Sequence, residues 1–495
     1  MSRPLRPHLS SPSLLRLCLL LLALAALGGC ATNPVTGDPD FVLMTQDQEI
    51  ATGRQYHQQL LKQYPVYEDE RLQAYVSRLG DELARNSHRS DLVFHFTVLD
   101  SQDVNAFALP GGYVYITRGI MAYMNSEAEL AGVLGHEIGH VTARHGVRQQ
   151  SAATVTGILG AVITARAGSQ AVGDLSNMLG TALIRGYGRE HELEADRLGA
   201  EYLARLGYDP QEMLGVVGIL KDQEEFEKQR AAEEGREPRI YHGVFSTHPD
   251  NDARLQEVIH AADRLKGATT RPAGRDTYLG MIDGMVWGPG AKQGVLRGRD
   301  FYHRDLGITL RFPPDWRVEN LPDRLLSLPH DNSALLQLTL EPLNQRQTAR
   351  QLLEAKFGAA NLRESRALDL GGLDGHSALA SLDTPFGQRA TRIAVILHGK
   401  NVYLFLAASK AEGARPRQDS VFLATIQSLR GLRSDEAALA EPRRIHVITA
   451  KSGDNFARLA RETDLNHHAE EILRLLNGMY PDGEPRPGQR IKIIK

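Results

Sequence analysis

Cysteine is almost missing from this chain of 495 residues, which contains only Cys18 and Cys30. Two cysteines exclude both a disulfide scaffold and a cysteine-rich zinc site, so a metal site here must use histidines and carboxylates. The formal net charge of −3 and the aromatic content of 6% argue against a nucleic-acid binder that depends on counterion release. Hydrophobic residues make up 42% and charged residues 24%, which excludes a globally disordered chain and favours several globular domains.

Hydrophobic runs of transmembrane length are missing as well. Residues 17–27 are apolar and follow three arginines, but they fall short of the roughly 20 residues that span a bilayer. They lead into the sequence LGGC, which resembles a bacterial lipobox and ends at Cys30. We predict a lipoprotein signal peptide at 1–29 and acylation of Cys30; the alternative is a plain secretion signal with an incidental cysteine. Because Ala31 follows instead of aspartate, the predicted location is the periplasmic side of the outer membrane, anchored in its inner leaflet.

Composition and hydrophobic pattern divide the rest of the chain into three domains, and the predicted fold class is multidomain α+β. The predicted segments are a mainly helical domain with a small sheet at 30–265, a Gly- and Pro-rich linker at 266–300, an α+β domain at 301–432, a second linker at 433–443 and a small unit at 444–495.

The segment with the clearest chemistry is His136-Glu137-Ile138-Gly139-His140. Ser126, followed by Glu129, is typical of a helix N-terminus, and the predicted helix runs to about residue 146. On a helix, residues four apart share one face, so His136 and His140 can bind one zinc ion while Glu137 reaches a water beside it. A chance match on a surface helix is the alternative, but apolar neighbours place this helix in the core, where such polar groups need a partner.

A catalytic zinc ion needs a third protein ligand, and the candidates lie on a predicted helix at 189–206. Glu192 and Asp196 are four residues apart and share a face, which favours Glu192 as the ligand. The spacing alone leaves open three other candidates on this acidic segment, namely Glu190, His191 and Glu194.

Several motifs together resemble the zinc metallopeptidase family that includes the CAAX endopeptidases and the HtpX-type membrane proteases, and especially its periplasmic branch of β-barrel assembly-enhancing proteases. The motifs are ATNPVTG after Cys30, NAFALPGGYVYITRG at 105–119, HEIGH at 136–140, ExxAD at 192–196 and STHP at 246–249. The resemblance covers residues 30–262. It departs in one respect, because no tetratricopeptide repeat follows the peptidase region.

The resemblance implies a zincin fold of the gluzincin type with one Zn²⁺ per chain, bound by His136, His140 and Glu192. It further implies that Asp196 orients one of the histidine ligands, and that the segment from Asn105 to Ile116 is an edge strand to which an extended substrate adds.

The resemblance also implies a place near the site for His248, which we predict as a second catalytic-site residue. Two roles are open: a displaceable zinc ligand that holds the enzyme off, or a group that flanks the oxyanion. Arg254, in the same region, is predicted only to pair with an acidic group.

The two C-terminal domains are expected to bind rather than to catalyse. The strand at 307–312, followed by Pro-Pro-Asp-Trp, resembles a Mog1/PsbP-type α+β fold. Residues 446–456 and 487–493 resemble the two ends of a LysM module with the order βααβ, which implies peptidoglycan as a partner. Asn455 stands where threonine is usual, and a cap without a ligand is the alternative.

The predicted function is zinc-dependent endopeptidase activity on misfolded or stalled envelope proteins, as part of outer-membrane quality control. The expected partners are unfolded or misassembled envelope proteins, the outer-membrane assembly machinery, peptidoglycan and, through the lipid anchor, the membrane; no nucleic acid is expected. Two alternatives remain: a chaperone or assembly scaffold with a latent site, and a peptidase directed at peptidoglycan.

Overall fold

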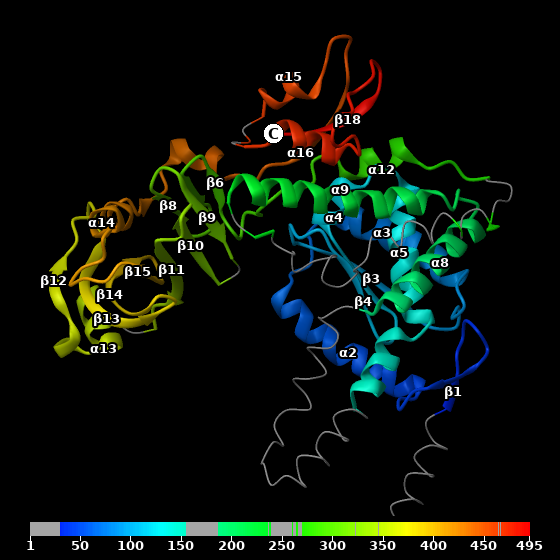
Figure 1. Ribbon diagram of the computed structural model, residues 1–495, viewed down its shortest axis with the longest axis horizontal. Helices are drawn as coiled ribbons and strands as arrows, with labels where there is room; N and C mark the ends of the chain where they lie inside the picture. The colour runs from blue at the N-terminus through cyan, green and yellow to red at the C-terminus, as the bar shows by residue number, and fades with distance from the viewer. Residues whose placement is uncertain are drawn as a thin grey trace, which may run out of the picture.

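The computed structural model of the protein describes residues 30–154, 187–235, 237–238, 260, 264–265 and 270–495, without 322, 345, 464 and 466. A helical domain with a small sheet lies beside a sheet-rich middle domain, and a small C-terminal unit sits above the helical domain (Figure 1). This mixture of helices and sheets agrees with the predicted α+β class. The predicted signal peptide at 1–29 and the region of His248 and Arg254 lie outside the described residues.

The helical domain contains a three-stranded sheet of order β3-β5-β4, in which β5 is parallel to β3 and antiparallel to β4. Its elements are β1 (Cys30–Thr32), β2 (Pro39–Phe41), α2 (Gln46–Gln63), α3 (Glu70–Arg85), β3 (His95–Leu99), β4 (Ala106–Leu109), β5 (Tyr113–Thr117), α4 (Arg118–Tyr123), α5 (Glu127–Thr142), α8 (Arg189–Arg205) and α9 (Glu212–Glu233).

Helix α5 is the centre of this domain. Apart from Glu129, all of its residues are buried, and it contacts the sheet, α3, α8 and α9. Its N-cap is Ser126, whose hydroxyl accepts a hydrogen bond from the backbone N–H of Glu129 at 3.0 Å, as the sequence predicted. The helix ends at Thr142 instead of about 146, because Arg144 takes a left-handed conformation with φ of 55° and a new helical segment begins at 145.

The turn between β4 and β5 is fixed against helix α2. Gly111 has φ of +79°, and a Cβ there would lie 2.7 Å from the Cα of Ile50, so no other residue fits without a shift. The buried carboxylate of Glu49 accepts hydrogen bonds from Arg89 at 2.7 Å and from Arg144 at 3.1 Å. Glu49 therefore connects α2 to the C-terminal end of α5.

Residues 266–300, for which the Gly and Pro content predicts a linker, include helix α12 (Arg275–Ile282). Tyr278, Leu279 and Ile282 are fully buried in the same hydrophobic core as α3 and α5. These apolar residues recur at helical spacing, so burying them outweighs the local cost of the glycines around them. This segment therefore packs against the helical domain as part of its core.

The C-terminal unit has the order strand, helix, helix, strand: β17 (Ile445–Thr449), α15 (Phe456–Ala460), α16 (Ala469–Leu476) and β18 (Arg490–Ile494), with β17 and β18 antiparallel. It shares the core of the helical domain through Phe456, Leu473 and Ile491. The buried ammonium of Lys492 donates to the carbonyls of Ala122 at 2.7 Å and Met124 at 2.6 Å. The unit is thus docked on the loop that precedes α5.

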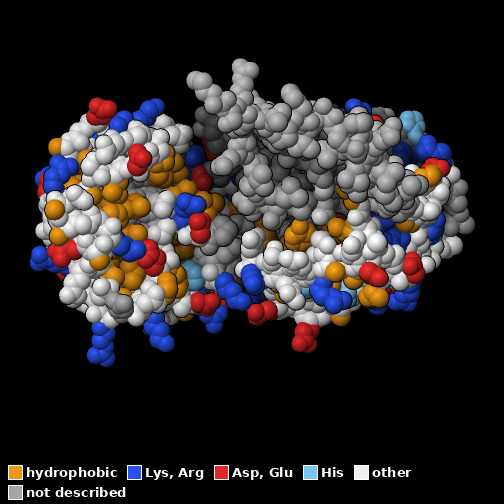
Figure 2. Space-filling model, turned by 90° about the horizontal axis from the view of Figure 1, so that it is seen from below, with side chains coloured by type: hydrophobic (Ala, Val, Ile, Leu, Met, Phe, Trp, Pro, Cys, Tyr) orange, Lys and Arg blue, Asp and Glu red, His pale blue; other side chains and the backbone are white. Residues whose placement is uncertain are grey.

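The middle domain consists of two antiparallel sheets, one of order β12-β13-β14-β15-β11-β10-β9 and one of order β16-β8-β7-β6. Its elements are β6 (Val295–Arg297), β7 (Asp300–His303), β8 (Ile308–Arg311), β9 (Trp316–Asn320), β10 (Arg324–Pro329), β11 (Ala334–Pro342), α13 (Ala349–Phe357), η1 (Ala359–Asn361), β12 (Arg363–Ala367), β13 (Asp374–Thr384), β14 (Gly387–His398), β15 (Asn401–Ser409), α14 (Asp419–Gln427), β16 (Arg430–Gly431) and η2 (Ser434–Ala440). Charged side chains of both signs are scattered over the face seen in Figure 2.

Among the helices that the structure describes, none combines the length and the hydropathy required to cross a bilayer.

Candidate metal centre

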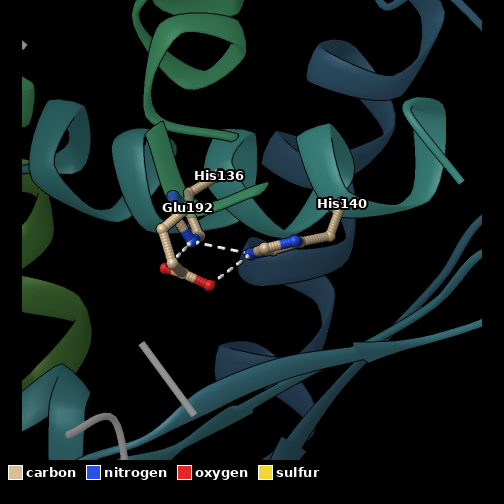
Figure 3. A group of neighbouring side chains, drawn as sticks. All are labelled: His136, His140 and Glu192. Atoms are coloured by element: carbon tan, nitrogen blue, oxygen red, sulfur yellow. Dashed lines mark hydrogen bonds and ion pairs between the residues drawn. The ribbon is translucent and has the colours of Figure 1, made fainter. Parts of the chain in front are cut away.

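Two histidines of α5 and one glutamate of α8 converge in the core of the helical domain (Figure 3). The Nε2 atoms of His136 and His140 are 3.0 Å apart. Each of them is 3.5 Å from a carboxylate oxygen of Glu192, which is fully buried. In a tetrahedral site with zinc–ligand distances of about 2.0–2.1 Å, the donor atoms lie about 3.3 Å from one another. The three donor atoms therefore fit one zinc ion.

The hydrogen-bond partner of His136 is also consistent with a zinc ligand at this position. Its Nδ1 lies 2.8 Å from Oδ1 of Asp196, which is fully buried on the same face of α8 as Glu192. A carboxylate accepts hydrogen bonds, so Nδ1 carries the proton and Nε2 directs its lone pair toward Glu192 and His140. This is the orienting role that the sequence resemblance implies for Asp196.

Small residues allow α5 and α8 to approach closely enough for this arrangement. A Cβ built on Gly135 would lie 3.3 Å from the Cα of Gly199, and one built on Gly139 would lie 3.1 Å from the carbonyl oxygen of Ala195. Each of these two α5 glycines directly precedes one of the histidines in the sequence, so the glycines, like the histidines, are four residues apart. The backbone of α8 thus packs directly on α5, and the side chain of Glu192 reaches the histidines.

We expect Gly139→Ala to destabilise the protein, because the added methyl group forces α8 away from α5. Overpacking of this kind costs about 1–3 kcal/mol, which in a domain of this size lowers the midpoint of thermal unfolding by several degrees. Gly218→Ala is the matched control, since a Cβ at Gly218 in α9 meets nothing within 4 Å and alanine is the better helix former. Equal unfolding midpoints for the two variants would contradict this account of the helix contact.

Residue Glu137 lies next to the first histidine and is 2% exposed. Burial raises the pKa of the nearby Tyr187, and the charges of Glu137 and Glu192 raise it further. The ring of Tyr187 stacks on His140, with 4.0 Å between the ring centroids. Tyr187 therefore closes one side of the site, and nothing in the sequence pattern had singled it out.

The structure also separates the alternative ligands on α8. Glu190 is exposed, and Glu194 is bonded to His145 and paired with Arg148 at 3.4 Å. His191 stacks on His145 with 4.3 Å between ring centroids. Among the described residues, the group that could hold a metal ion contains Glu192 and none of these three.

Residue His145 is the functional candidate that sequence reasoning missed. It is fully buried, and its Nδ1 lies 2.8 Å from Nδ1 of His140. Along an unbroken helix the two residues would point about 140° apart, so spacing gave no reason to join them. The left-handed turn at Arg144 brings His145 back against His140.

Strand β4 lies at the edge of the described three-strand sheet and contacts α5. Strand β5 lies between β3 and β4, so of the segment predicted as an edge strand only β4 has that position. A small pocket between the strand and the helix is lined in part by Leu109, Val141 and Tyr187, together with His140. The edge strand and the candidate metal centre are therefore neighbours.

Comparison with known proteins bears out the resemblance. Residues 70–262 match the model of peptidase family M48. The chain is 34% identical over 255 residues to the β-barrel assembly-enhancing protease of Yersinia pestis, which covers 50% of each chain. It is 30% identical over 290 residues to that of Escherichia coli (strain K12), covering 56% of this chain and 57% of the relative. The mitochondrial metalloendopeptidase OMA1 of Arabidopsis thaliana is 32% identical over 164 residues, which is 32% of this chain and 33% of that protein.

The fold and the site thus define a candidate metal centre, which lies in the part of the chain that is similar to metallopeptidases. Residues 70–262 are similar to the peptidase family M48 domain, and the bacterial relatives that share this similarity are β-barrel assembly-enhancing proteases. The chain spans about half the length of those relatives. The solution structure of cyanobacterial PsbP from Synechocystis sp. PCC 6803 aligns with 28% of this chain and 94% of that chain, at a TM-score of 0.22 and 11% identity. With so low a TM-score, the Mog1/PsbP-type fold of the middle domain stays a prediction.

Proposed function

We propose that this protein is a zinc-dependent endopeptidase that degrades misfolded or stalled proteins of the bacterial cell envelope. The observation that carries the proposal is the convergence of His136, His140 and Glu192 inside an M48 domain, with Glu137 beside the first histidine. The names of the bacterial relatives support a role in outer-membrane protein quality control.

In the proposed mechanism, His136, His140 and Glu192 hold one zinc ion per chain. Zinc bound there supplies a Lewis acid, which lowers the pKa of water and polarises a scissile carbonyl. The carboxylate of Glu137 accepts the proton of the attacking water and passes it to the nitrogen of the leaving amine as the C–N bond breaks. Asp196 keeps His136 in the tautomer that binds metal.

We further propose that the substrate binds in extended form along β4. An extended segment that adds to a sheet edge gains backbone hydrogen bonds that do not depend on its sequence. A protease for misfolded proteins needs this kind of recognition. The contact between β4 and α5 would place such a segment beside the metal site.

The test of the proposed function is cleavage of unfolded casein by the zinc-loaded full chain, with purified peptidoglycan sacculi as a parallel substrate. The proposal expects zinc-dependent cleavage of casein and no release of fragments from sacculi. Cleavage of sacculi alone would support the alternative of a peptidoglycan peptidase, for which the βααβ order of the LysM-like unit is the supporting observation. Prevention of casein aggregation without any cleavage would support the scaffold alternative.

Membrane attachment through Cys30 is the second part of the proposal. We expect Cys30→Ser to move the protein from the outer-membrane fraction to the soluble periplasmic fraction, because several acyl chains on one cysteine bind firmly and the described helices add no membrane span. Cys18→Ser is the control and should remain in the membrane, since Cys18 lies in the segment predicted to be cleaved. Fractionation with an antibody checks both, and a Cys30→Ser protein that still sediments with outer membranes would overturn the anchor.

A further inference from the structure

We infer that His145 and Glu194 form a positioning relay for the metal ligand His140. In this relay, Glu194 holds His145, and His145 fixes the tautomer and the ring orientation of His140. The inference rests on the proposed zinc site and deepens it. It concerns residues that bind neither metal nor substrate.

The proton positions follow from the distances. If His140 binds metal through Nε2, its other ring nitrogen, Nδ1, carries the proton. Nδ1 of His145 lies 2.8 Å away, so it must accept this hydrogen bond with its lone pair. The proton of the neutral His145 ring is then on Nε2, which lies 3.0 Å from Oε2 of Glu194. Each N–H group of the relay thus donates a hydrogen bond to an acceptor.

The relay is held rigidly on both sides. His145 is fully buried; its ring stacks on that of His191, with 4.3 Å between the centroids, and lies at a tilt of 56° to that of Tyr187, with 5.8 Å between the centroids. The guanidinium of Arg148 lies 3.4 Å from Oε2 of Glu194 and helps to hold this carboxylate in place. Ring orientation in a metal site depends on such locked partners.

The two histidine ligands are thus supported in parallel ways. His136 is backed directly by the carboxylate of Asp196 at 2.8 Å. His140 is backed by the carboxylate of Glu194 through one intervening imidazole. Both carboxylates come from α8, the helix that also supplies Glu192, so one helix supplies the third donor and supports both histidines.

The test is the zinc dissociation constant of the full chain, measured by competition with a chromophoric chelator. His145→Phe keeps the ring and its stacking but removes both hydrogen bonds, and we expect it to raise the dissociation constant 10- to 100-fold. Glu194→Gln keeps an acceptor for His145 but removes the charge, so a smaller rise of a few-fold is expected. His191→Phe is the matched control, because it keeps a ring stacked on His145 and leaves both hydrogen bonds of the relay in place, and it should change the constant less than twofold.

Circular dichroism and the unfolding midpoint establish that each variant is folded, and Glu194→Gln carries the test if His145→Phe does not fold. A dissociation constant within twofold of wild type in a folded His145→Phe or in Glu194→Gln would overturn the relay. An equal loss in His191→Phe would overturn it too, because general disturbance of the stack would then explain the effect. If wild type binds zinc but cleaves no protein, the proposed function fails while the relay still stands or falls on these constants.

Discussion

Replacing Glu137 by glutamine should abolish peptide cleavage while zinc stays bound. The amide is close in shape to the carboxylate but cannot take a proton from water, and general-base catalysis contributes roughly 10²–10⁴-fold. The three donor atoms of His136, His140 and Glu192 are unchanged, so the zinc content should equal that of wild type. The measurement is the initial rate of casein cleavage with zinc determined in the same sample.

The control for Glu137→Gln is Glu190→Gln, which makes the same chemical change at an exposed position of α8. Its cleavage rate should match wild type. A Glu137→Gln protein that keeps more than about a hundredth of the wild-type rate would show that Glu137 is not the general base.

The second large effect is expected for Glu192→Ala, which should lose zinc and, with it, both activity and stability. In this variant only the two imidazoles remain as zinc ligands. Zinc that binds only the folded state, at a free concentration 1,000 times its dissociation constant, adds about 4 kcal/mol to the free energy of unfolding, and this stabilisation is lost. We therefore expect zinc content close to zero and an unfolding midpoint equal to that of wild type treated with a chelator.

This prediction also separates Glu192 from its neighbours. Adding a chelator should lower the unfolding midpoint of wild type but leave that of Glu192→Ala unchanged. Full zinc occupancy in Glu192→Ala would mean that Glu190, His191 or Glu194 is the true ligand.

Those parts of the site that depend on local spacing could be predicted from the sequence. His136 and His140 are one helical turn apart, and Glu192 and Asp196 are as well, so each pair had to share a face. The orientation of α8 against α5 could not be read from spacing, because it depends on the close contact of Gly135 and Gly199 between segments far apart in the chain.

The role of His145 was beyond sequence reasoning for a different reason. It depends on the left-handed conformation of Arg144, a residue type that gives no signal for such a turn. For α12, by contrast, the signal was present in the sequence. Tyr278, Leu279 and Ile282 have helical spacing, but the surrounding glycines and prolines favoured the prediction of a linker. Composition there was a weaker guide than hydrophobic periodicity.

The most direct test of the central claim is anomalous diffraction at the zinc edge from crystals of the full chain grown with zinc. The account predicts one strong peak per chain, about 2.0–2.2 Å from Nε2 of His136, Nε2 of His140 and a carboxylate oxygen of Glu192. A peak coordinated instead by His145, His191 or Glu194, or no peak between α5 and α8 at full zinc, would contradict it.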